Sequence, residues 1–177
     1  MSMAQYRNNC PSPITIVETL KQAHHLHETW GKKLKKIPTV DNLIEKLKQD
    51  IAATQHAMRT FGVLKICKQC EEKEGGSCCG QGIELKYNAM LLLINLILGV
   101  SFPKKNYSPN SCFFLGEKGC VLIARHVLCV NYLCSQIKRK LTTDELIQLQ
   151  NIAGEELYTA FKLHEAIKNF IGYNHEQ

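Results

Sequence analysis

The sequence predicts a mainly α-helical protein, in which three long helices and one buried apolar helix form a bundle that carries an inserted cysteine-rich, metal-binding region. Three observations predict this fold. Apolar residues recur at the spacing of one helix face, residues typical of helix ends bracket these stretches, and eight of the nine cysteines lie between residues 67 and 134. The length of 177 residues suits a single domain, 1–177.

The frame of the bundle is expected from two parts of the chain, residues 13–61 and 141–172, with the insertion at 62–140 between them. The first helix is predicted over 13–35, with its apolar stripe at Ile16, Leu20, Ala23, His27, Trp30 and Leu34. The second begins near Thr39 and runs to Phe61, with its stripe at Val40, Leu43, Ile44, Leu47, Ile51, Thr54, Met58 and Phe61.

The last long helix is predicted from Thr142 or Thr143 to Ile171, because a capping threonine precedes two acidic residues, as the helix dipole prefers. Its expected stripe is Leu146, Leu149, Ala153, Leu157, Ala160, Phe161, His164, Ile167 and Ile171. We expect the three long helices to pack lengthwise, with a helix over the apolar run 86–99 completing a four-helix arrangement.

The insertion itself gives weaker signals. Residues 62–85 are rich in glycine and charge and are expected to form a loop that a metal would order. A second loop is predicted over 100–111, a short strand over 120–124, and one or two helical turns over 130–137.

Charge and hydropathy limit the partners. The net charge of +6 counts the thiols as neutral, so we interpret it as compensation for a sulfur-rich site rather than as a nucleic-acid surface. Nucleic acid is therefore not an expected partner. The chain shows no signal-peptide core and no apolar run long enough to span a membrane, which predicts a cytoplasmic protein without membrane contact. Disulfides are disfavoured in that compartment, so clustered cysteines indicate metal binding.

The cysteines occur as four pairs: Cys67-x2-Cys70, Cys78-Cys79, Cys112-x7-Cys120 and Cys129-x4-Cys134. Zinc needs four such ligands in a tetrahedron, and iron–sulfur clusters also use cysteine thiolates, so both chemistries fit. Adjacent cysteines do not readily chelate one ion, so the second pair suggests two metals, or one ligand and one spare thiol. The spacing leaves open two four-cysteine zinc sites, one cluster with spare thiols, and a binuclear centre.

The order of these cysteines, together with Cys112-Phe-Phe-Leu, Gly119-Cys120 and Arg125, resembles the YkgJ-like CxxCxxCC cysteine-cluster family, which is described as zinc- or iron-chelating. The resemblance implies that the metal ligands are Cys67, Cys70, Cys78, Cys79, Cys112, Cys120, Cys129 and Cys134. Two features depart from the family pattern. Seven residues precede the adjacent pair where two are usual, and Arg125-His126 stands where Arg-Pro is usual.

Arg125 and His126 are predicted to lie near the metal without binding it, where the guanidinium would offset thiolate charge. His24, His27 and His164 are interpreted as core or half-buried side chains. No catalytic motif is present, so no reaction is assigned.

The leading hypothesis is a protein with a cysteine-ligated iron–sulfur centre, used in electron transfer, redox sensing or cluster handling. The alternative is a zinc-stabilised, non-catalytic module that binds protein or nucleic acid. A protein partner is expected, and no oligomeric state is predicted.

Overall fold

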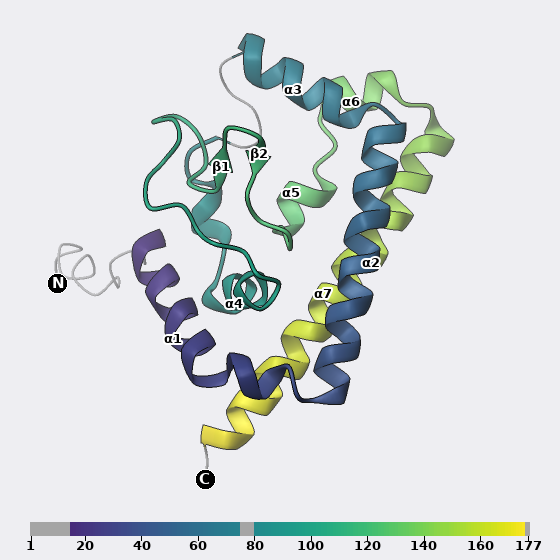
Figure 1. Ribbon diagram of the computed structural model, residues 1–177. Helices are drawn as coiled ribbons and strands as arrows, with labels where there is room; N and C mark the ends of the chain where they lie inside the picture. The colour runs from purple at the N-terminus through teal and green to yellow at the C-terminus, as the bar shows by residue number, and fades with distance from the viewer. Residues whose placement is uncertain (1–14, 75–79, 176–177) are drawn as a thin grey trace, which may run out of the picture.

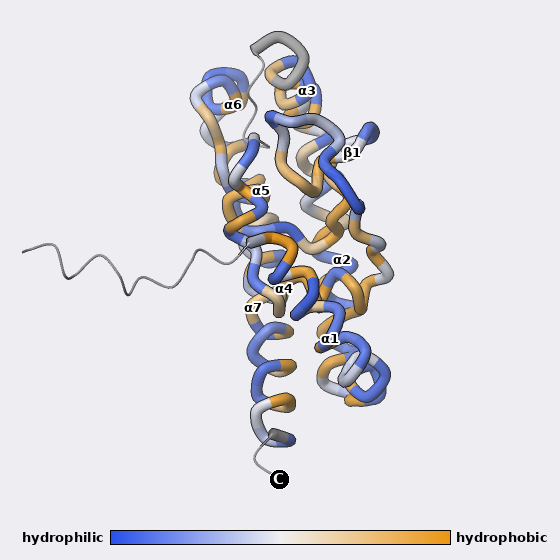
Figure 2. Tube along the Cα trace, turned by 90° about the vertical axis from the view of Figure 1, so that its left-hand side faces the viewer, coloured by the Kyte–Doolittle hydropathy of each residue, from blue (hydrophilic) through white to orange (hydrophobic). Residues whose placement is uncertain are grey.

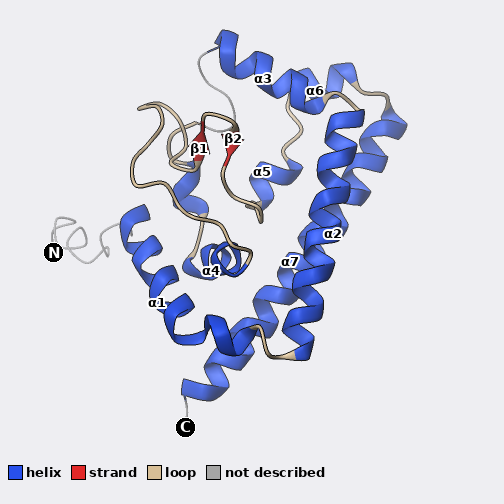
Figure 3. Ribbon diagram, viewed as in Figure 1, coloured by secondary structure: helices blue, strands red, loops and turns tan. Residues whose placement is uncertain are grey.

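The computed structural model describes residues 15–74 and 80–175 and confirms a mainly helical fold (Figure 1). A small hairpin is the one sheet among the described residues, and loops surround it (Figure 3). The elements in chain order are α1 (Ile16–Leu34), α2 (Pro38–Thr60), α3 (Val63–Glu74), a 3₁₀ turn η2 (Ile83–Lys86), α4 (Ala89–Ile97), β1 (Leu115–Gly116), β2 (Gly119–Cys120), α5 (Val127–Asn131), α6 (Ser135–Lys140) and α7 (Thr143–His175).

The two longest helices, α2 and α7, lie side by side and form the main helix pair of the fold (Figure 1). The predicted stripe of α2 is confirmed, because its residues at this interface are buried. Along α7, polar and apolar segments alternate turn by turn, as expected for a helix with one buried face (Figure 2). The capping box predicted at its start is present: Glu145 N–H donates to Thr142 Oγ1, and the Glu145 carboxylate accepts from Thr142 N–H.

The predicted stripe of α7 is wrong in its middle. Leu149, Ala153 and Ile167 are buried as expected, but Phe161 is 60% exposed and Leu163 is fully buried in its place. The buried face advances in steps of three and four residues, and two residues along a helix point about 200° apart. Phe161 therefore faces away from α2 when Leu163 faces it.

Helix α1 does not lie along the long pair, which corrects the expectation that all three long helices pack lengthwise. It packs on α4 instead, and only its C-terminal end reaches α7, where Trp30 meets Phe170 edge-on at 5.9 Å. The chain changes direction between α1 and α2 at Ile37, whose backbone is extended (φ −86°, ψ 116°), and Pro38 is the first residue of α2. Proline suits this first helical position because it needs no N–H partner there.

Residues 63–74 form a helix, α3, so the loop predicted over 62–85 is wrong in its first half. Gly62, with φ of 72°, ends α2 in the left-handed region, and the chain re-enters a helix at once. Helix α3 packs against α6, where Val63 and Ile66 share an apolar cluster with Leu133 and Ile137. These few apolar residues were too sparse to reveal the helix in the sequence.

A backbone bridge joins the segment at residue 80 to the segment at residue 111, which belong to the two halves of the cysteine region. Gly80, which follows Cys79, forms an antiparallel bridge with Ser111, which precedes Cys112. Strands β1 and β2 pair antiparallel, with Leu115 opposite Cys120. The short strand predicted over 120–124 is therefore misplaced, because its backbone leaves the hairpin after Cys120. The helix predicted over 86–99 is confirmed as α4, which Asn88 caps and Gly99, at φ 91°, ends.

Asn95 is the polar residue that interrupts the apolar run of α4, and it is fully buried. Its side-chain Nδ2 donates to the carbonyls of Leu91 (2.9 Å) and Ala124 (2.8 Å). Its Oδ1 accepts from the backbone N–H groups of Ile123 (2.9 Å) and Ala124 (3.1 Å). One amide thus satisfies the backbone of a buried loop and ties it to α4.

Across residues 15–74 and 80–175, no helix combines the length and the apolar character of a membrane span.

Replacing Asn95 by leucine is expected to lower the free energy of unfolding by about 3 kcal/mol, because two loop N–H groups and one carbonyl lose their buried partner. Urea denaturation followed by circular dichroism measures the effect. Asn151→Leu, at an exposed position of α7, is the control and should change stability little. Equal stability of Asn95→Leu and the wild type would contradict the role given to this amide.

Candidate metal centre

Three of the predicted ligands, Cys112, Cys120 and Cys129, line a single small cavity beside α4 and the hairpin. Its volume is about 40 Å³, enough for a water or an ion and far below the several hundred Å³ of an organic-ligand pocket. Its full lining is Ile83, Tyr87, Cys112, Leu115, Cys120, Arg125 and Cys129. The cavity is therefore a candidate for a single bound ion rather than for a substrate.

Each cysteine reaches the cavity from a different local structure. Cys112 follows the Gly80–Ser111 bridge, Cys120 ends β2, and Cys129 lies in the first turn of α5, where its N–H donates to His126 O at 2.7 Å. Two features bring Cys112, Cys120 and Cys129 to one cavity. The β1–β2 hairpin reverses the chain after Cys112, and the side chain of Asn95 then holds the backbone of residues 123 and 124 by hydrogen bonds.

Two of the thiols of this cavity, Cys112 and Cys120, resist ionisation in the folded chain. Burial raises the pKa of Cys112 to about 12 and also raises the pKa of Cys120, an effect that the nearby Arg125 guanidinium partly offsets. Cys112, Cys120 and Cys129 form no disulfide. At neutral pH, Cys112 and Cys120 are thus neutral unless a cation replaces the proton.

Tyr87 is a member of this site that the sequence reasoning missed. Its side chain is 4% exposed, and its hydroxyl donates to Cys129 Sγ at 3.5 Å while accepting from His126 N–H at 3.0 Å. Burial raises the pKa of this phenol. The sequence did offer one signal. Tyr87 lies just before the predicted buried helix, and the hydroxyl of a buried tyrosine normally forms a hydrogen bond with a nearby group.

The two residues predicted to lie near the metal have different positions. Arg125 lines the cavity, and its Nη2 approaches Met58 Sδ at 4.0 Å. The imidazole of His126 caps α5 instead, with Nδ1 accepting from Leu128 N–H at 3.2 Å, and burial lowers its pKa. His126 therefore acts on the site through the helix that carries Cys129.

Three of the remaining predicted ligands, Cys67, Cys70 and Cys134, are not among the residues that line this cavity. Cys67 and Cys70 are on α3, and Cys134 precedes α6 and packs against the same apolar cluster as Ile66. Cys78 and Cys79 lie outside the described residues. Over 15–74 and 80–175, no group of three or more His, Cys, Asp or Glu side chains is arranged so that it could hold a metal ion. The donor chemistry of the cavity fits a soft metal, but the described thiols do not form a coordination shell.

The other histidines are distributed over the helices. His27 and His164 are half-buried, as interpreted from the sequence, and burial lowers the pKa of His27. His24 is exposed and meets Phe102 edge-on at 5.7 Å, which corrects its interpretation as a buried side chain.

A buried polar cluster connects Arg125 to the α2–α7 interface. Glu156 of α7 is 2% exposed, and Thr159 Oγ1 donates to Asp50 Oδ2 of α2 at 2.7 Å. Arg125 Nε and Glu156 Oε2 are buried atoms for which the described residues provide no hydrogen-bond partner. Burial raises the pKa of Glu156, against the opposing effects of Thr54 and Arg125.

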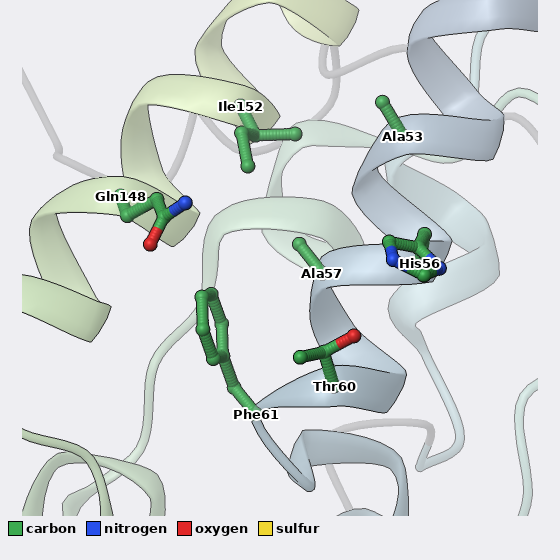
Figure 4. Close-up of a pocket in the computed structure, with 7 residues that line it drawn as sticks. All are labelled: Ala53, His56, Ala57, Thr60, Phe61, Gln148 and Ile152. Carbon is green, nitrogen blue, oxygen red and sulfur yellow. The ribbon is translucent and has the colours of Figure 1, made fainter.

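A larger hollow of about 260 Å³ lies between α2 and α7, and no cysteine is among its lining residues (Figure 4). Ala57 and Phe61 approach it from α2, and Gln148 and Ile152 approach it from α7. Its lining is almost entirely apolar and includes a single titratable group, His56, so it offers no paired acid, base or nucleophile.

Comparisons of the chain with models of protein families, with curated proteins and with solved structures found no match. The resemblance to the YkgJ-like family therefore stays a prediction.

Glu156→Gln tests the state of the buried carboxyl. Because the pKa in the folded protein is raised above the ordinary 4.5, ionisation of Glu156 costs stability as pH rises through the raised value. Glutamine keeps the shape without the charge, so the variant should gain stability over the wild type as pH rises above 4.5. Urea denaturation from pH 4 to 8 measures this difference.

Glu155→Gln, at the neighbouring exposed position, is the matched control and should show no such trend. A Glu156→Gln variant that loses stability increasingly with pH would contradict the interpretation, because the carboxylate would then be ionised and held by Arg125.

Proposed function

We propose that the chain is a metal-binding protein whose metal is held by cysteine thiolates at the cavity of Cys112, Cys120 and Cys129. The observation that carries the proposal is that these three thiols, from a loop, a strand and a helix, line one ion-sized cavity. They do not form a coordination shell by themselves among the described residues, so metal binding would require them to move together or to gain a further ligand. Thiolates are the ligands that zinc, copper(I) and iron–sulfur clusters prefer. A bound metal would supply the positive charge that buried thiolates need.

The full set of eight cysteines remains part of the proposal. Gly80, which follows Cys79 in the sequence, is bridged to Ser111, which precedes Cys112. Helix α3, with Cys67 and Cys70, contacts the segment that carries Cys134. These contacts support two groups of thiols, one at the cavity and one at the α3–α6 contact.

The volume of the cavity bears on the choice of metal. About 40 Å³ suits one ion, whereas an iron–sulfur cluster contains several iron and sulfide atoms and would require the walls to move apart. The geometry therefore favours a single ion such as zinc over the iron–sulfur centre that led the sequence-based hypotheses. Bound zinc would hold the two halves of the cysteine region together, as structural zinc sites do.

A binding role for a zinc-stabilised module has separate support. Helix α5, which carries Cys129, exposes Val127 (47%) and Leu128 (43%), and Tyr132 directly after it is 55% exposed. Three exposed apolar side chains beside a metal-ordered turn suit contact with a protein partner.

Protein purified without oxygen is expected to contain metal in a fixed ratio to the chain, by elemental analysis. Each of Cys112→Ser, Cys120→Ser and Cys129→Ser should lose most of that metal, because each removes a ligand. Cys10→Ser, outside the cysteine cluster, is the matched control. Thermal unfolding of the metal-free proteins shows whether each variant folds.

The nature of the metal separates the two candidate functions. A colourless protein with zinc supports the single-ion centre, and a brown protein with inorganic sulfide supports the iron–sulfur centre. Wild-type protein that binds neither, or three variants that keep the wild-type metal content, would refute the proposed site.

A further inference from the structure

The hydroxyl of Tyr87 occupies a fixed position between two groups of α5. It accepts the His126 N–H at 3.0 Å and donates its own proton toward Cys129 Sγ at 3.5 Å. His126 is the N-cap of α5, and Cys129 lies in its first turn, with its N–H bonded to His126 O. One hydroxyl therefore contacts both the start of this short helix and the thiol that the helix presents.

The ring that carries this hydroxyl is held in place. Tyr87 packs against the fully buried Phe114 at 5.1 Å between ring centroids, and against His126 at 5.7 Å. The backbone on its C-terminal side enters α4 through the Asn88 cap, where Leu91 N–H donates to Asn88 Oδ1 at 2.8 Å. A donor on so constrained a ring needs no reorganisation to reach the sulfur.

We propose that Tyr87 is a positioning residue of the thiolate metal centre, which fixes the direction of Cys129 and donates a hydrogen bond to its sulfur. The inference rests on the proposed function and adds to it a residue outside the cysteine set. A hydrogen bond to a thiolate is charge-assisted, so it favours the ionised sulfur and reduces the electron density that the sulfur gives to the metal. Arg125, on the same cavity, supplies charge but lacks this direct bond to Cys129.

The test compares Tyr87→Phe with the wild type, using Co²⁺ as a spectroscopic probe in the full chain. Phenylalanine keeps the ring and its packing on Phe114 and removes only the hydroxyl. We expect about a 10-fold weaker Co²⁺ affinity and a shift of the sulfur-to-cobalt charge-transfer band. Tyr132→Phe, at an exposed tyrosine just after α5, is the matched control and should leave both unchanged.

A second measurement uses the wild-type protein, so it does not depend on how well the variant folds. Binding of Co²⁺ should produce a near-ultraviolet tyrosine difference signal, which Tyr132→Phe keeps and Tyr87→Phe loses. If wild-type protein binds Co²⁺ without this signal, or if Tyr87→Phe matches the wild type in affinity and charge-transfer band, the role of Tyr87 is refuted and the metal centre stands. If wild-type protein binds no Co²⁺, both proposals fail.

Discussion

The amide of Asn95 is the interaction on which the candidate centre depends. Helix α4 is buried on most sides, so a polar side chain within it must satisfy its hydrogen bonds inside the protein. Asn95 does so with the backbone of Ile123 and Ala124, the two residues before Arg125. Arg125, the N-cap His126 and Cys129 follow these two residues in the chain, so α4, which contains no cysteine, helps to position the thiol of Cys129.

The same segment connects the thiol cavity to the long helix pair. Arg125 borders the cavity on one side, and on the other it approaches Met58 of α2 and the buried Glu156 of α7. Arg125 Nε and Glu156 Oε2 have no hydrogen-bond partner among the described residues, and burial raises the pKa of Glu156, which favours its neutral form. Arg125 therefore lies between the thiol cavity and the helix pair without forming an ion pair to Glu156.

Features with strong local signals were predictable from the sequence, and features that depend on tertiary contacts were not. The stripe of α2 was predicted correctly because apolar residues dominate its buried face, although Asp50 and Thr54 are buried there too. Helix α7 also buries Glu156 and Thr159, and its buried face was predicted wrongly at Phe161 and Leu163. Helix α3 was missed because its stability comes from packing on α6. The cysteine spacing predicted a metal site but left the grouping of the cysteines open, and only the folded chain places Cys112, Cys120 and Cys129 on one cavity with Tyr87 beside them.

Charge balance links the composition of the chain to the cavity. The net charge of +6 holds only while the thiols are neutral, and burial raises the pKa of Cys112 and Cys120, which favours their neutral forms. Ionising all three cavity thiols would place three negative charges around one small cavity, of which Arg125 offsets one. The two that remain equal the charge of a divalent cation. Proton release and binding of such an ion are therefore expected to occur together, since neither is favourable in this cavity alone.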